Sequence, residues 1–112
     1  MEASDGNAYV LMDPESKVVG FGQVLFREGN VLHLARLIVD PGLRGQGVGR
    51  DLCVALMDIG SANQPAEYVT LNVYESNRAA VRLYQSLGFE IKERGDSGAL
   101  AMVKTRKEGE CR

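Results

Sequence analysis

The 112-residue sequence lacks tryptophan and has only two cysteines and one histidine. Two cysteines, Cys53 and Cys111, are too few for the disulfide framework of a small secreted domain, and they favour the reducing cytoplasm. No apolar run approaches the roughly 20 residues that a membrane-spanning helix needs, and the first residues lack the character of a signal peptide. We therefore expect a cytoplasmic protein that does not bind a membrane.

An excess of charge of one sign is also absent. The formal net charge is −2, from 13 basic and 15 acidic residues, so we expect no nucleic-acid partner. Histidine, cysteine and carboxylate residues do not recur at the spacing of metal ligands, and we expect no metal. Apolar residues make up 45% of the sequence, which is typical of a globular protein. We expect one domain over residues 1–112, with a frayed tail at 105–112.

The periodicity of apolar residues predicts eight elements in the order β-β-β-α-β-α-β-β. Strands are expected at residues 7–13, 18–27, 31–39, 68–74, 89–94 and 99–104. A first helix begins at Val48 and stops at Gly60, and a second helix is capped by Ser76 and ends at Gly88. The predicted fold class is α/β, with a mixed sheet whose two strands flanking the first helix are parallel.

Three glycines alternate in the loop Arg44-Gly45-Gln46-Gly47-Val48-Gly49-Arg50, between the third predicted strand and the first helix. The first N–H groups of a helix have no helical partner, and together with the helix dipole they attract anions. Glycine gives a phosphate access to such a backbone. A P-loop would require a lysine after the glycines, and a dinucleotide fingerprint would require G-x-G-x-x-G, and neither is present. Taken alone, the loop could bind a phosphate or be a plain turn.

A second motif follows. Asn77, Ala80, Leu83, Tyr84, Gly88 and Phe89 stand at the positions of Asn-x-x-Ala-x-x-Leu-Tyr-x-x-x-Gly-Phe. With this motif and Arg44-x-x-Gly47-x-Gly49 in the right order, the sequence resembles the GNAT family of acetyl-CoA-dependent N-acetyltransferases over about residues 7–105. The resemblance implies a GNAT-like fold and transfer of an acetyl group from acetyl-CoA, as co-substrate, to a primary amine of a small molecule or peptide.

The resemblance also assigns site residues. The loop backbone would hold the pyrophosphate of coenzyme A, and the edge of the third strand and Asn77 would hold the pantetheine arm. The implied cofactor-binding residues are Leu37, Ile38, Val39, Arg44, Gly45, Gln46, Gly47, Val48, Gly49, Arg50 and Asn77. Tyr84 would be the general acid, since a phenol can protonate the departing thiolate. From the residues alone, Asn77 could simply begin a helix, and Tyr84 could be a core tyrosine.

The general base is left open between an ordered water, His33 and Glu75. Histidine has a suitable unperturbed pKa, and Glu75 lies close to the second motif. Protein-N-terminal acetylases of the family often use a glutamate on the strand before the conserved asparagine. The matching residue here is Asn72, which cannot accept a proton.

One departure from the family concerns the N-terminal part. Family members usually begin with a strand and one or two helices that help form the acceptor site, and this chain starts at what would be the second strand. The missing elements are either truncated, absent by nature or supplied by another chain. Because uncovered sheet edges and apolar faces usually find a partner, we expect a homodimer. Two alternatives stay open: a non-catalytic acyl-CoA-binding module, and a partial domain that a partner chain completes.

Overall fold

The computed structural model describes residues 6–43, 47–63 and 66–105. Its strands are β1 (Gly6–Met12), β2 (Val18–Arg27), β3 (Val31–Val39), β4 (Tyr68–Tyr74), β5 (Glu90–Arg94) and β6 (Ala99–Thr105). Its helices are α1 (Val48–Asn63) and α2 (Arg78–Ser86), with a short 3-10 helix at Pro41–Leu43. The predicted α/β class and order of elements are confirmed. Thr105 belongs to β6 rather than to a tail, and residues 106–112 lie outside the described residues.

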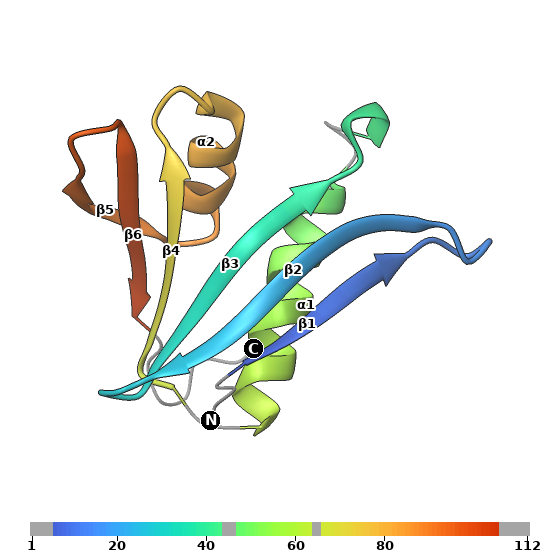
Figure 1. Cartoon of the computed structure of the whole chain (residues 1–112), viewed down its shortest axis with the longest axis horizontal. Coiled ribbons are helices and arrows are strands. Elements are labelled where there is room, and N and C mark those ends of the chain that lie inside the picture. Colours follow the sequence, from blue (N-terminus) through green and yellow to red (C-terminus); the bar gives the residue numbers. More distant parts are fainter. Residues whose placement is uncertain (1–5, 44–46, 64–65, 106–112) are drawn as a thin grey trace.

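The strands form one mixed sheet in the order β1-β2-β3-β4-β6-β5 (Figure 1). β3 and β4 are parallel, as predicted, and the other neighbouring strands are antiparallel. β3 and β4 pair only from Val31–Tyr68 to Leu34–Leu71. Beyond this point the two strands diverge, so that a V-shaped gap opens between their carboxyl ends (Figure 1).

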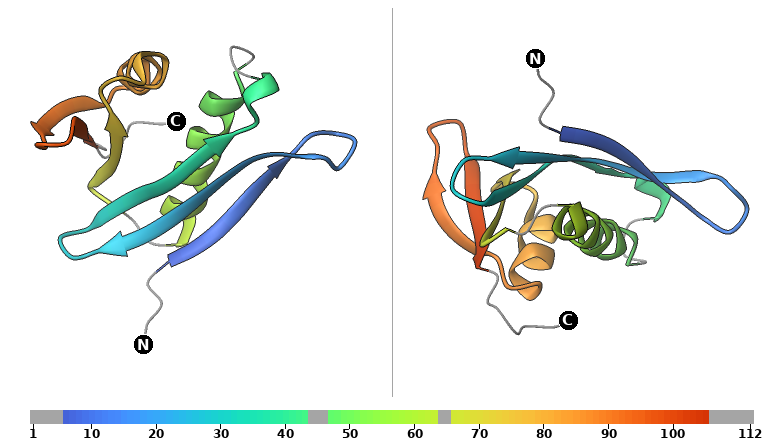
Figure 2. Two further views of the ribbon diagram at one scale, coloured as in Figure 1. Left: turned by 45° about the horizontal axis from the view of Figure 1, so that its top comes forward. Right: turned by 90° about the horizontal axis from the view of Figure 1, so that it is seen from below.

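Both helices lie on the same face of the sheet (Figure 2). The main core lies between this face and the helices, and it includes Val24, Leu32, Leu34, Leu52, Leu56, Val69, Leu71, Leu100 and Met102. No described element covers the opposite face, which we call the open face and which is turned toward the viewer in Figure 1. Register and strand alternation place Val10, Phe21, His33, Ile38, Tyr68, Thr70, Asn72 and Tyr74 on the open face.

Two predicted helix boundaries are wrong. α1 does not stop at Gly60 but continues to Asn63. A Cβ atom at Gly60 would lie 2.6 Å from Cδ2 of Leu32, so this glycine allows α1 to approach β3 closely. The N-cap of α2 is Asn77 rather than Ser76, and the Asn77 side chain accepts a hydrogen bond from the backbone N–H of Ala80 at 3.3 Å.

Candidate functional site

A β-bulge changes the direction of the end of β3. β2 and β3 pair on both sides of Arg36, but between these paired segments β3 carries one residue more than β2. Arg36 adopts a left-handed φ of 55°. Opposite the bulge stands Gly22, where a Cβ atom would lie 3.0 Å from Cδ2 of Leu37 and 2.5 Å from Cδ1 of Leu56 in α1. The bulge therefore places Leu37 on the helix side of the sheet, where it needs a glycine beside it.

A cleft of about 380 Å³ lies between the end of β3 and α2. Its lining comes from the end of β3, the start of α1 and one face of α2. The lining residues are Leu37, Val39, Leu43, Gly47, Gly49, Arg50, Asn77, Ala79, Ala80, Leu83 and Tyr84. The fold thus brings together Leu37, Val39, Gly47, Gly49, Arg50, Asn77 and Tyr84 from the predicted site.

Other predicted site residues lie elsewhere. The side chain of Ile38 points to the open face and is 58% exposed, because strand alternation turns it away from Leu37 and Val39. Val48 begins α1 and does not line the cleft. Arg44, Gly45 and Gln46 lie outside the described residues.

Several lining residues were not predicted, namely Leu43, Ala79, Ala80 and Leu83. Ala80 and Leu83 follow Asn77 at helical spacing, so they share its face of α2, and the period of the helix could have identified them. Leu43 lies in the 3-10 helix, which no comparable sequence pattern indicates.

The start of α1 offers backbone groups to the cleft. Gly47 has a left-handed φ of 82°, and among the described residues no heavy atom lies within 4 Å of the position that its Cβ would occupy. The described residues therefore leave the space beside this backbone open. At Gly49 a Cβ atom would lie 3.2 Å from Cδ2 of Leu83, so glycine lets α1 start close to α2. The first N–H groups of α1 have no partner within the helix and can bind an anion here.

The free edge of β3 supplies further polar groups. After Leu34, β3 has no pairing with β4, so the backbone between Ala35 and Val39 faces the gap with its edge groups unpaired in the sheet. Such N–H and C=O groups require hydrogen-bond partners. An extended ligand with amide groups could pair with this edge much as a strand would.

Tyr84 lines the cleft and is 8% exposed. Its ring packs edge-on to Phe89, with the centroids 6.0 Å apart. Among the described residues the hydroxyl has no hydrogen-bond partner, and it is not one of the fully buried polar atoms, so it reaches the cleft. Burial raises the pKa of Tyr84 to about 12, and the nearby Cys53 adds to this shift. The phenol is therefore protonated at neutral pH.

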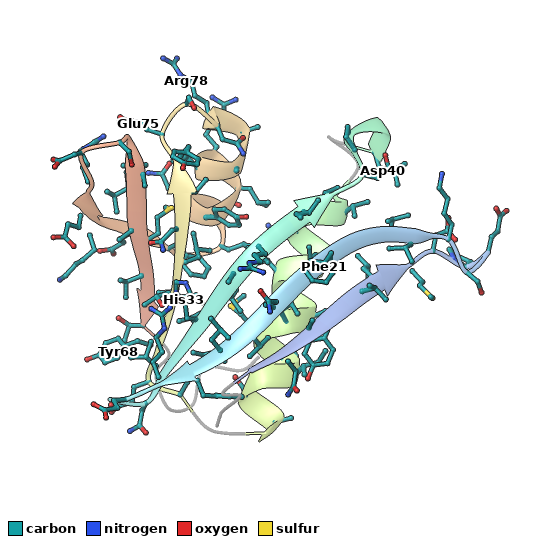
Figure 3. The ribbon with its side chains drawn as sticks, in the orientation of Figure 1. Phe21, His33, Asp40, Tyr68, Glu75 and Arg78 are labelled. Atoms are coloured by element: carbon teal, nitrogen blue, oxygen red, sulfur yellow. The ribbon has the colours of Figure 1, made fainter. Side chains whose placement is uncertain are left out.

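The two side chains considered as a base lie outside the cleft lining. His33 is 5% exposed, and its Nδ1 is 2.7 Å from Oγ1 of Thr70, where β3 and β4 are still paired (Figure 3). Burial, together with the Arg27 guanidinium, lowers the pKa of His33 to about 4, so the ring is neutral at pH 7. Glu75 stands at the opposite end of β4, where its carboxylate accepts a hydrogen bond from Arg94.

The structure of residues 6–43, 47–63 and 66–105 also bears on metal binding and on membrane crossing. These residues contain no group of three or more histidine, cysteine, aspartate or glutamate side chains placed to hold a metal ion. Neither α1 nor α2 has the length and apolar character that crossing a membrane would require.

Comparisons with known proteins match this geometry. Residues 1–89 match the acetyltransferase (GNAT) family. The peptidyl-lysine N-acetyltransferase YjaB of Escherichia coli (strain K12) is 38% identical over 64 residues, which cover 57% of this chain and 40% of that protein. The spermine/spermidine N(1)-acetyltransferase of Bacillus subtilis (strain 168) is 32% identical over 72 residues, which cover 63% and 47%. The chain therefore spans less than half the length of these two relatives.

A solved structure supports the same fold. The spermidine N-acetyltransferase from Vibrio cholerae, in complex with CoA and spermine, superposes with a TM-score of 0.81 at 18% identity. The match covers 90% of this chain and 66% of that one. At this identity the likeness concerns the fold alone.

Proposed function

Since the chain belongs to the acetyltransferase (GNAT) family, we propose that it transfers an acetyl group from acetyl-CoA to a primary amine. The observation that carries the proposal is the cleft itself, which combines the Tyr84 hydroxyl, the start of α1 and the unpaired edge of β3. We treat residues 1–112 as a single acetyltransferase-like domain. The acceptor is an amine on a small molecule or a peptide, as the names of the two relatives suggest.

The residues of the cleft suit acetyl-CoA as co-substrate. The open backbone at Gly47 and the start of α1 would hold the pyrophosphate, with Arg44, Gly45, Gln46, Val48 and Gly49 completing the loop and Arg50 adding a positive charge. The edge of β3 at Leu37, Ile38 and Val39 would pair with the amides of the pantetheine arm. Asn77 caps α2 and lines the cleft, so it is placed where it could also bind the pantetheine arm.

The reaction requires an acid that protonates the departing sulfur and a base that takes a proton from the acceptor ammonium. The amine nitrogen forms a bond to the thioester carbonyl carbon, the C–S bond breaks, the sulfur leaves with the electron pair, and the acylated nitrogen releases its remaining extra proton to solvent. Tyr84 donates its phenolic proton to that sulfur and is reprotonated from solvent. An alkylammonium has a pKa of about 10.4, so its deprotonation at pH 7 costs about 4–5 kcal/mol. His33 is hydrogen-bonded to Thr70, and Glu75 is hydrogen-bonded to Arg94. We therefore propose that an ordered water takes this proton.

The variant Tyr84→Phe tests the role of the hydroxyl. General acid catalysis contributes roughly 100- to 10,000-fold, so kcat should fall by that factor, while affinity for acetyl-CoA stays within a few-fold. The melting temperature should change little, because the ring is kept and the hydroxyl has no partner among the described residues. A folded Tyr84→Phe protein with parental turnover would refute the assignment. Thiol release from acetyl-CoA and calorimetry on the same preparation provide both readouts.

A non-catalytic acyl-CoA-binding module is the second candidate. It is favoured by the cleft lining, which includes neither His33 nor Glu75, the two side chains considered as a base. Stabilisation by acetyl-CoA without thiol release in the presence of any amine would support it. Turnover would exclude it.

Assembly and location are proposed on similar grounds. We propose a homodimer, because β1 is an outer strand of the sheet and Val10 and Met12 on it are more than half exposed. Analytical ultracentrifugation at micromolar concentration tests this, and a well-behaved monomer would count against it.

The buried free thiol of Cys53 is consistent with the reducing cytoplasm that we propose as the location of the protein.

A further inference from the structure

The open face forms two walls beside the gap between β3 and β4. Counting from the last pair, Leu34–Leu71, three steps along β4 lead to Tyr74. On β3 the bulge adds one residue, so the matching position is Ile38. Both side chains point to the open face, and both are largely exposed, Tyr74 at 61% and Ile38 at 58%. Tyr74 and Ile38 therefore flank the gap on the side opposite to the cleft.

The wall on the β3 side is apolar. The register pairs Val10 with Phe21 and Phe21 with Ile38, so these side chains form one row across three neighbouring strands of the open face. Phe21 lies over β2 in Figure 3. On the other side of the gap, Tyr74 pairs with Ala99 of β6 and Asn72 with Ala101. The open-face side chains of the strand residues beside the gap thus include aliphatic, aromatic and amide groups.

Carboxylates are absent from the strands that border the gap. Among the described residues, no open-face position of β1, β2, β3, β4 or β6 is occupied by aspartate or glutamate. The nearest on this face are Glu90 and Glu93 of β5, which lies beyond β6 and about 10 Å from β4. A cationic group inside the gap would therefore lose hydration without gaining a counter-charge from these strands.

The two acidic residues at the ends of the gap already have partners. At the end of β4, Glu75 is paired with Arg94. At the end of β3, Asp40 accepts a hydrogen bond from the backbone N–H of Gly42 at 2.9 Å and lies 4.0 Å from Nζ of Lys17. These carboxylates are satisfied within the chain and favour a second positive charge on a ligand less than free carboxylates would.

We propose that the acceptor carries its reacting amine on an uncharged apolar body, which packs between Tyr74 and Ile38 as the amine enters the gap. This inference rests on the proposed function and narrows its substrate class. Binding becomes more favourable when an apolar group covers such side chains. It becomes less favourable when an ammonium loses its water without gaining a counter-ion. Long polyamines, which carry further ammonium groups, are therefore poor acceptors, and amines with an aliphatic or aromatic body are good ones.

The first test compares two amines with the same number of heavy atoms, heptylamine and hexane-1,6-diamine. They differ only at the far end, where one has a methyl group and the other an ammonium. With the full chain and saturating acetyl-CoA, thiol release should give heptylamine a kcat/KM at least about tenfold higher, in the range typical of discrimination by apolar pockets. Equal values, or a preference for the diamine, would overturn the inference and leave the proposed function intact. No thiol release with either amine, despite bound acetyl-CoA, would overturn both.

The second test uses two tyrosines of one strand. Tyr74→Ser removes the wall beside the gap, whereas Tyr68→Ser removes a tyrosine on the same open face of β4 at the end where β3 and β4 are paired. Tyr68 is 42% exposed, so both variants should fold. We expect Tyr74→Ser to raise KM for heptylamine by about tenfold, with parental affinity for acetyl-CoA, and Tyr68→Ser to change neither. Equal effects of the two variants, or no effect of Tyr74→Ser, would contradict the role of Tyr74.

Discussion

Gly47 allows the phosphate-binding role of the loop to be separated from backbone strain. The variant Gly47→Ala adds a Cβ atom that would meet no heavy atom of the described residues within 4 Å. The substitution therefore destabilises the fold only through the backbone conformation. A residue other than glycine at a φ of 82° lowers the free energy of unfolding by about 1–2 kcal/mol. If the backbone of Gly47 contacts the pyrophosphate, the same Cβ atom also occupies the space of a phosphate oxygen.

Gly98 provides the matched control. It has a φ of 89° and, like Gly47, no heavy atom of residues 6–43, 47–63 or 66–105 within 4 Å of its Cβ position, but it lies in the turn between β5 and β6. Gly98→Ala should therefore lose about the same free energy of unfolding as Gly47→Ala, about 1–2 kcal/mol. The two variants differ only in their distance from the cleft.

The assay measures affinity and stability on the same preparations. Calorimetry with acetyl-CoA should show a Kd at least about tenfold higher for Gly47→Ala, which corresponds to about 1.4 kcal/mol, and a parental Kd for Gly98→Ala. Urea unfolding should show similar losses of stability in both. If a folded Gly47→Ala protein binds acetyl-CoA as the parent does, the loop is a turn and the phosphate lies elsewhere.

Three further predictions concern stability. Because the folded pKa of His33 is near 4, the unfolded chain binds its proton first as the pH falls below 6.5. Urea unfolding should therefore show a loss of about 2–3 kcal/mol between pH 6.5 and 4, which His33→Gln abolishes. Gly60→Ala should destabilise by about 1–2 kcal/mol in the same assay, since its Cβ atom would overlap Leu32. Above pH 10 unfolded tyrosine ionises before the buried Tyr84, and Tyr84→Phe should remove about 2 kcal/mol of alkaline destabilisation between pH 10 and 12.

The order of elements was predictable because each segment has a clear apolar period with turn residues at its ends. Asp40-Pro41-Gly42 follows the end of β3 where expected, and the glycines at 95 and 98 bound the turn of the last hairpin. Gly60 shows where this reasoning fails. Glycine after an apolar helical run usually marks the C-terminus of a helix. Here the glycine lies within α1, and its lack of a side chain makes room for Leu32 of β3. That contact is tertiary, so no local pattern contains it.

The shape of the cleft depends on features that the sequence does not display. The bulge at Arg36 turns Leu37 and Val39 toward the helices and leaves Ile38 on the open face. A stretch of alternating apolar residues gives no sign of one inserted residue. The pairing of β3 with β4 ends after Leu34, and this divergence results from the whole sheet rather than from any residue in it. The sequence could indicate the residues of the edge but not which side each of them faces.

Tyr84 illustrates why apolar periodicity alone cannot separate a core tyrosine from one in a reactive site. Its face of α2 is apolar in both cases, because the cleft that it borders is itself lined by leucine, valine and alanine. Burial of the ring supports packing against Phe89, and the same burial raises the pKa of the phenol and keeps its proton in place. What distinguishes the two cases is the hydroxyl, which reaches the cleft without a partner among the described residues. A core tyrosine would satisfy that hydroxyl internally, since a buried polar group without a hydrogen bond costs about 1–3 kcal/mol. The Tyr84 hydroxyl is instead open to the cleft, where it can donate to a group that arrives with the substrate.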